Sequence, residues 1–189
     1  MASIALDPAY RRISVEEFLD MDFGDAKAEL EDGLIYMMAG GDEAHARIAA
    51  NLIASLMPRL RGTGCRPYGS DFAAQTADRS VRFPDVSIHC NNPGSPENAQ
   101  KKLLGDPRAL FEVLSPSTSR HDQKTKLDEY RDLAGTQEIV FVDPESERVR
   151  LVRRTGKTGW ADDWLQPGED LHLPSLSLTI PHSEIFARD

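Results

Sequence analysis

Two short apolar segments, residues 82–88 and 109–115, limit most strongly what this chain can fold into. Both are rich in the aromatic and β-branched residues that favour strands, and each carries one carboxylate near its middle, Asp85 in the first and Glu112 in the second. An ionised carboxylate is costly to bury unless a cation or a hydrogen-bond donor meets it. Two such carboxylates on neighbouring strands could together hold a metal ion.

The neighbours of the two carboxylates indicate where each side chain points. Pro84 cannot donate a hydrogen bond to a strand ladder, which fits the edge or the opening of a strand and leaves Asp85 near an exposed sheet end. In strict alternation Glu112 shares a face with Leu110 and Leu114, so it points into or beside the core. A structural interpretation stays open, in which Glu112 pairs with an arginine and Asp85 caps a turn.

The length of 189 residues predicts a single domain spanning residues 1–189, because domains commonly contain about 100–200 residues. Hydrophobic residues make up 40% of the chain, and no apolar run approaches the roughly 18 residues of a membrane span. Residues 1–8 lack the basic start and the longer apolar stretch of a secretion signal, so we expect a soluble, cytoplasmic protein. Cys65 and Cys90 have no metal-ligand spacing, and we expect them to be reduced thiols.

The net charge of −9 counts against a generic nucleic-acid-binding domain, because contacts to phosphates need lysine and arginine. The charge is unevenly distributed along the chain. Residues 46–130 contain nine acidic and twelve basic side chains, whereas the segments before and after them are net acidic. The net-basic part of the chain is therefore the part that contains both carboxylate segments.

Hydrophobic periodicity predicts a β-hairpin over residues 28–38, a helix over residues 43–60, an antiparallel pair formed by residues 66–75 and 81–89, a helix from residue 119 or 122 to residue 133, and a buried strand over residues 139–142. In the hairpin, Glu29 and Glu31 share one face of the first strand. His45 lies on the apolar stripe of the first helix, where a histidine is more often part of the core than a ligand. The second helix stacks three polar side chains on one face, namely Asp122, Lys126 and Tyr130.

These segments follow one another in the order seen in the Uma family, which the sequence resembles over roughly residues 14–145. The residues that carry the resemblance are 14–18, 31–33, 45, 84–86, 111–118, 122, 126, 130 and 138–144. The run Glu-Val-Leu-Ser-Pro-Ser-Thr at residues 112–118, followed by the pattern at 122, 126 and 130, is quite specific. The family comprises bacterial proteins described as putative restriction endonucleases, within the PD-(D/E)XK nuclease superfamily.

The resemblance implies an α/β (α+β) fold of the restriction-endonuclease type, with a central mixed β-sheet flanked by helices, extra antiparallel strands, and a Mg²⁺ or Mn²⁺ site at the sheet edge. Asp85 resembles the metal-binding aspartate of the superfamily, Glu112 its second acidic residue, and Glu31 the acidic residue contributed by the N-terminal part. These three are the predicted metal ligands. With His45 and Lys126 they make up the predicted catalytic set.

The sequence departs from the superfamily signature at one place. Where a lysine is expected two residues after Glu112, the chain has Leu114, and the Uma family looks similar there. A lysine from the next helix can substitute, because an ammonium on a long stem can approach from a different backbone position. Lys126 is the best candidate and Lys124 the second.

The leading hypothesis is a metal-dependent endonuclease that hydrolyses phosphodiester bonds in DNA and works as a homodimer, as duplex-cutting nucleases frequently do. Leu114 and the acidic net charge favour an alternative, a catalytically inactive module that binds nucleic acid or a protein partner. A nuclease that acts on RNA or on a branched intermediate is a third hypothesis, because nothing in the sequence indicates how a base sequence would be recognised.

Overall fold

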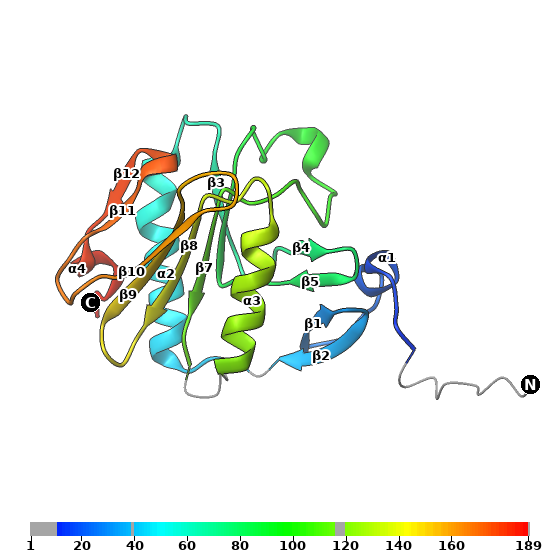
Figure 1. The fold of residues 1–189 in the computed structure, drawn as a ribbon. Helices are drawn as coiled ribbons and strands as arrows, with labels where there is room; N and C mark the ends of the chain where they lie inside the picture. The colour runs from blue at the N-terminus through cyan, green and yellow to red at the C-terminus, as the bar shows by residue number, and fades with distance from the viewer. Residues whose placement is uncertain (1–10, 39, 116–119, 189) are drawn as a thin grey trace, which may run out of the picture.

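The computed structural model describes residues 11–38, 40–115 and 120–188 and has a mixed α/β fold (Figure 1). Its centre is a six-stranded sheet with the strand order β10-β9-β8-β7-β6-β3. These strands are β3 (Arg66–Gly69), β6 (Val86–His89), β7 (Ala109–Val113), β8 (Glu138–Asp143), β9 (Arg148–Arg154) and β10 (Trp160–Trp164). Strands β7 and β8 are parallel, and the other neighbouring pairs are antiparallel. The predicted mixed central sheet is therefore confirmed.

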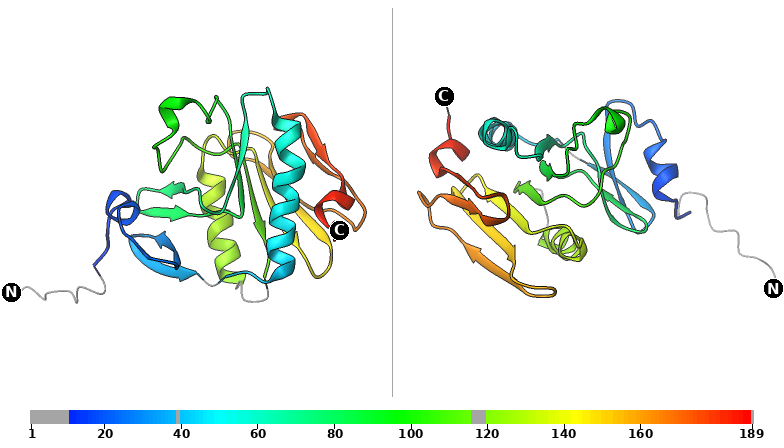
Figure 2. Two further views of the ribbon diagram at one scale, coloured as in Figure 1. Left: turned by 180° about the vertical axis from the view of Figure 1, so that it is seen from behind. Right: turned by 90° about the horizontal axis from the view of Figure 1, so that it is seen from above.

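Two helices, α2 (Glu43–Leu60) and α3 (Arg120–Asp132), lie on opposite sides of this sheet (Figure 2). Helix α2 begins at Asp42, whose carboxylate accepts a hydrogen bond from the backbone N–H of His45 at 2.9 Å. Its buried stripe of Ile48, Leu52 and Leu56 packs on one face of the sheet. The 3.6-residue period read from the sequence thus predicted both the helix and its buried face.

Strand β7 alternates between the two sides of the sheet. Ala109, Phe111 and Val113 belong to the core beneath α2, whereas Leu110 packs in the cluster formed with Leu127, Tyr130 and Leu133 of the α3 segment. Glu112 lies between Phe111 and Val113 and therefore points to the α3 side, as the alternation predicted. A carboxylate consequently interrupts an otherwise apolar face directly under α3.

A second sheet, of four strands in the order β2-β1-β5-β4, lies beside the first (Figure 1). Its strands are β1 (Lys27–Glu31), β2 (Leu34–Met38), β4 (Ala74–Ala77) and β5 (Ser80–Arg82). Asp32 and Gly33 both have positive φ, 45° and 80°, which is the two-residue turn expected for the predicted hairpin. The short helix α1 (Val15–Leu19) closes one side of this small sheet through Phe18.

The antiparallel pair predicted for residues 66–75 and 81–89 is present but divided between the two sheets. Strand β3 pairs with β6 in the large sheet, and β4 pairs with β5 in the small one. Residues 83–85 connect β5 to β6, and Pro84 has no N–H to offer to a ladder at this crossing. Asp85 therefore lies where the two sheets meet.

The structure corrects the prediction of reduced thiols, because Cys65 and Cys90 form a disulfide. Arg66 is paired with His89 across β3 and β6, so the two cysteines occupy the next opposing positions. The register between these strands joins residues 25 positions apart in the sequence, and nothing in the cysteine spacing could reveal it.

The C-terminal part packs against α2. It consists of β11 (Leu171–Leu173), β12 (Leu178–Ile180) and the short helix α4 (His182–Ile185), and its apolar residues join the core on the α2 side. Two 3₁₀ helices, Pro96–Asn98 and Pro174–Leu176, complete the regular structure of the described residues. Within these residues, no helix combines the length and the hydrophobicity that crossing a bilayer would require.

Candidate active site

The crossing between the two sheets brings Asp85 next to Glu112. Val86 pairs with Phe111 across β6 and β7, so Asp85 stands opposite Glu112 at the following position. The Asp85 Oδ2 atom accepts a hydrogen bond of 2.7 Å from the backbone N–H of Val113. The two predicted carboxylates therefore come together where β6 begins and β7 ends, as their strands suggested.

His45, in the first turn of α2, reaches the same carboxylate. Its Nε2 atom lies 3.1 Å from Asp85 Oδ2, and this hydrogen bond raises the pKa of His45 against the opposing effect of burial. The neighbouring Gly41 makes room for the ring, since a Cβ at that position would lie 2.6 Å from His45 Nδ1. The predicted His45 thus contacts a predicted metal ligand and orients it.

Glu112 receives hydrogen bonds from two residues one turn apart on α3. The Tyr130 hydroxyl donates to Oε1 at 2.5 Å, and Lys126 Nζ lies 3.4 Å from Oε2. Burial raises the pKa of Glu112 to about 7; the ammonium of Lys126 opposes this, and the negative charges of Asp85 and Glu29 add to it. The spacing of four residues on α3 therefore explains why the helix meets this carboxylate twice.

Lys126 bridges the two sheets. Its Nζ atom contacts Glu29 Oε1 of β1 at 3.1 Å as well as Glu112 of β7, and all three side chains are almost fully buried. Lys124, the second candidate for the displaced lysine, is exposed. The apolar cluster beneath α3 includes Leu114, the residue at the expected lysine position. Lys126 is accordingly the candidate lysine that the structure brings to Glu112.

Two glutamates of β1, Glu29 and Glu31, lie close to the site and differ in their contacts. Glu31, the residue predicted from the sequence, is partly exposed and pairs with Arg82 at 2.8 Å. Glu29, two residues earlier on the same face, is buried, contacts Lys126 and accepts a hydrogen bond from the N–H of Phe83 at 3.2 Å. The sequence predicted the shared face and proposed Glu31; in the structure Glu29 contacts Lys126 and Glu31 pairs with Arg82.

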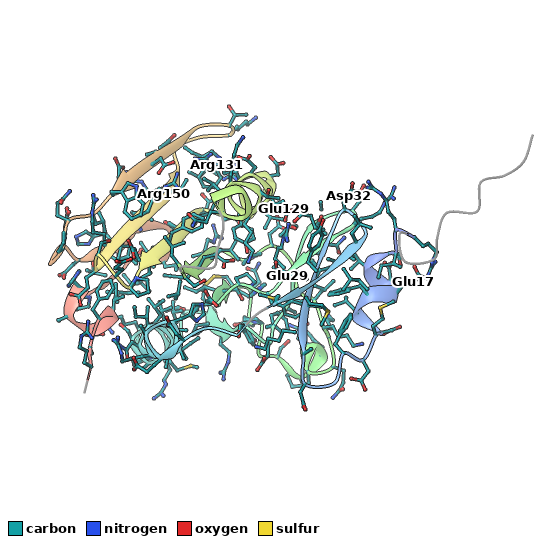
Figure 3. All side chains as sticks on the ribbon, turned by 90° about the horizontal axis from the view of Figure 1, so that it is seen from below. Glu17, Glu29, Asp32, Glu129, Arg131 and Arg150 are labelled. Atoms are coloured by element: carbon teal, nitrogen blue, oxygen red, sulfur yellow. A yellow bond between two sulfur atoms is a disulfide. The ribbon has the colours of Figure 1, made fainter. Side chains whose placement is uncertain are left out.

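Arg82 is the functional-site neighbour that sequence reasoning missed. Its side chain is 1% exposed and pairs with Glu29 at 3.1 Å, with Glu31 and with Glu129 of α3 at 2.7 Å. Figure 3 labels Glu29 and Glu129, which lie between the small sheet and α3. One sequence feature could have indicated this role, namely that Arg82 stands at the start of an apolar segment. A guanidinium buried there requires carboxylate partners.

The site carries more negative than positive charge. Arg82 and Lys126 pair with the carboxylates of Glu29, Glu31, Glu129 and Glu112, and Asp85 pairs with the ring of His45. The raised pKa of Glu112 is a direct consequence of burial combined with this shortage of positive charge. An additional cation would be favoured beside Asp85 and Glu112.

Among residues 11–38, 40–115 and 120–188, no three His, Cys, Asp or Glu side chains are already grouped as metal ligands. Mg²⁺ usually binds proteins through one or two carboxylates and takes its other ligands from water and phosphate. The adjacent carboxylates of Asp85 and Glu112 fit that mode of binding, whereas Glu31 is directed to Arg82. The predictions for residues 116–119 and for the side chain of Asp122 fall outside the described residues.

Comparisons with known proteins identify the family and the fold of this chain. A family model, Uma2, described as putative restriction endonuclease, matches residues 15–182. An uncharacterised protein of Synechocystis is 28% identical over 179 residues, which are 94% of this chain and 93% of the relative. The crystal structure of a putative nuclease belonging to DUF820 from Anabaena variabilis has a TM-score of 0.77 at 19% identity, covering 93% of this chain and 98% of the other. The predicted restriction-endonuclease-like fold is therefore confirmed.

Proposed function

The chain belongs to the Uma2 family of putative restriction endonucleases, and from this premise we propose that it is a metal-dependent endonuclease that hydrolyses phosphodiester bonds in DNA. The observation that carries the proposal is that Asp85 and Glu112 meet where β6 begins and β7 ends, with Lys126 beside Glu112. These groups correspond to the parts that the reaction needs, namely carboxylates for a hard cation and a further cation beside them. The relative from Anabaena variabilis, itself described as a putative nuclease, supports this choice.

In this proposal Asp85 and Glu112 hold Mg²⁺ or Mn²⁺. Glu31, the third ligand expected from the sequence, would have to leave Arg82 to join them. A bound divalent ion lowers the pKa of a water molecule and neutralises the charge of the scissile phosphate. The N–H of Val113 and the ring of His45 fix the direction of the Asp85 carboxylate. Their role is to orient this carboxylate before substrate binds.

Lys126 orients the attacking water in this proposal, in place of the lysine that Leu114 replaces. Its ammonium reaches Glu112 from α3, and Glu29 holds it from the opposite side. The ammonium group of a lysine offers three hydrogen-bond donors and no acceptor. Lys126 therefore acts as a donor that positions water and stabilises charge, and Glu29 keeps it in place.

Nicking of supercoiled plasmid in Mg²⁺ or Mn²⁺ tests the proposal. The purified protein is compared with three variants, Asp85→Asn, Glu112→Gln and Lys126→Met, each checked for folding by its thermal unfolding. Lys124→Met is the matched control, since it removes an exposed lysine from the same helix. We expect nicking by the wild type and the control only. Full activity in Asp85→Asn or Glu112→Gln would show that another site performs the cleavage.

The second candidate is an inactive module that binds nucleic acid or a protein partner. It is favoured by the two contacts that already engage both oxygens of Glu112, from Tyr130 and from Lys126. Calorimetric titration with Mn²⁺, with and without DNA, separates the candidates. Heat of binding that disappears in Asp85→Asn supports the endonuclease, and its absence in the wild type supports the inactive module.

Two further features of the proposal concern the protein as a whole. We expect a homodimer by analogy with nucleases that cut both strands of a duplex, and analytical ultracentrifugation would measure its mass. The cytoplasmic location remains a prediction from the sequence. The disulfide between Cys65 and Cys90 does not support it, because disulfides persist mainly in oxidising compartments.

A further inference from the structure

The outer strand of the small sheet, β2, exposes three consecutive large apolar side chains. Ile35 is 38% exposed, Tyr36 49% and Met37 60%. Strand β2 pairs with β1 on one side and is the edge of its sheet on the other. Single exposed apolar residues are common, but three in succession on an edge strand place apolar surface on both faces of the sheet.

The register of the hairpin separates the two faces. Tyr36 pairs with Glu29, whereas Met37 pairs with Ala28 on the opposite face. Opposing residues in an antiparallel pair project to the same side and lie about 4.5–5.5 Å apart. Since Glu29 contacts Lys126 of the candidate active site, Tyr36 lies on the side of the sheet that faces this site. Ala28 belongs to the core with Phe18, so Met37 lies on the other side.

The charge of the protein limits how it can hold a nucleic acid. Contacts to many phosphates need many cations, and this chain has 22 basic and 31 acidic residues. Beside the two candidate metal ligands, Arg82 and Lys126 are already paired with carboxylates. Stacking on an uncharged ring is a source of affinity that this acidic charge does not oppose.

We propose that Tyr36 is a stacking platform for an unpaired nucleobase, and that the substrate is single-stranded DNA with its scissile phosphate at Asp85 and Glu112. Aromatic side chains beside a nucleic-acid channel stack on bases of any type, because every base has a π face. A paired base inside a duplex has both faces covered by its neighbours. Tyr36 therefore selects unpaired DNA over a closed duplex, and in a supercoiled plasmid it would act where negative supercoiling opens the duplex. This inference rests on the proposed nuclease function.

Fluorescence anisotropy tests the proposal in a Glu112→Gln background, which keeps the oligonucleotide uncut. A short labelled single strand, and the same strand annealed to its complement, are titrated with the protein in Mg²⁺. Three variants are compared with the parent: Tyr36→Ala, Tyr36→Phe, and Met37→Ala as the control on the opposite face of the same strand. A 2-aminopurine base in the single strand reports stacking directly, because its fluorescence falls when it stacks.

We expect Tyr36→Ala to weaken single-strand binding by about five- to 150-fold and to abolish the 2-aminopurine quenching. Tyr36→Phe keeps the ring and should change binding by less than about twofold, and so should Met37→Ala, which lies on the other face. Duplex binding should be weaker than single-strand binding and insensitive to Tyr36→Ala. Equal effects of Tyr36→Ala and Met37→Ala, tighter duplex binding, or no measurable binding of the single strand would overturn the proposal.

Two outcomes separate this inference from the proposed function. If the wild type nicks plasmid and Tyr36→Ala binds the single strand as tightly as its parent, the stacking role of Tyr36 is wrong and the proposed nuclease function is supported. If no substrate is cut but stacking on Tyr36 is observed, the stacking role of Tyr36 is supported and the proposed nuclease function is wrong. A change of oligomeric state in Tyr36→Ala, measured by ultracentrifugation, would instead make β2 an interface with a second copy and would overturn the platform.

Discussion

The buried histidine of β6, His89, makes the stability of the protein depend on pH in a way that can be calculated. Its Nδ1 atom lies 3.1 Å from the carbonyl oxygen of Gly105, and because a carbonyl only accepts, Nδ1 carries the proton. Nε2 is buried and has no hydrogen-bond partner among the described residues. A second proton would have no acceptor, and burial lowers the pKa of His89 from its ordinary 6.5 to about 4.

The direction of the effect follows from which state binds the proton. Above pH 6.5 the histidine is neutral in both the folded and the unfolded state, so its burial does not lower the free energy of unfolding. As the pH falls below 6.5, the unfolded chain binds a proton that the folded chain does not bind until about pH 4, so the free energy of unfolding falls. With these two pKa values, the loss between pH 8 and pH 5 is about 2 kcal/mol.

Urea denaturation at pH 8 and pH 5 measures this loss. We expect wild type to lose about 2 kcal/mol more than His89→Gln between the two pH values, because glutamine binds no proton. Other groups, including Glu112 with its raised pKa, titrate in both proteins and cancel in the difference. His172→Gln, at an exposed position, serves as the control and should follow wild type. An equal loss in wild type and His89→Gln would refute the assignment of the pH dependence to His89.

Arg82→Met should lower the free energy of unfolding by about 3–5 kcal/mol in urea, because it leaves buried carboxylates without their cation; Arg11→Met, which removes an exposed pair, should leave the midpoint unchanged. Gly41→Ala should reduce plasmid nicking by up to about 100-fold, because its Cβ would displace the ring of His45 from Asp85. Gly40→Ala is the matched control, since its Cβ would meet no atom of the described residues within 4 Å. Equal nicking by the two glycine variants would contradict the role of His45.

Local pattern accounts for the elements that could be predicted from the sequence. The stripe of α2 and the Asp32–Gly33 turn of the hairpin depend on residues a few positions apart, and both are present as expected. The division of residues 66–89 between two sheets depends on which strands pair, and hydrophobic alternation does not encode the partner of a strand. The disulfide of Cys65 and Cys90 follows from that same pairing, and so it was missed for the same reason.

For the candidate site, the cost of burying charge explains which residues the sequence singles out and which it does not. Asp85 and Glu112 were detectable because each is a lone carboxylate in an apolar strand, where only a functional or paired group is tolerated. Glu29 was not distinguishable from Glu31, because both lie on one face of β1 and their difference arises only when the small sheet docks against α3. The sequence therefore predicts a charged face, and tertiary packing selects the residue.

The position of Lys126 has a consequence for how the site is held together. Glu29 comes from the small sheet and Glu112 from the large one, and Lys126 joins them from α3 with distances of 3.1 and 3.4 Å. A shift of the small sheet would therefore change how the ammonium is shared between the two carboxylates, and with it the charge at Glu112. Arg82 restrains that shift, since it binds β1 and α3 at once through Glu29 and Glu129. The buried ion pairs between the sheets thus fix the relative position of the groups proposed for catalysis, which a purely apolar contact would define less sharply.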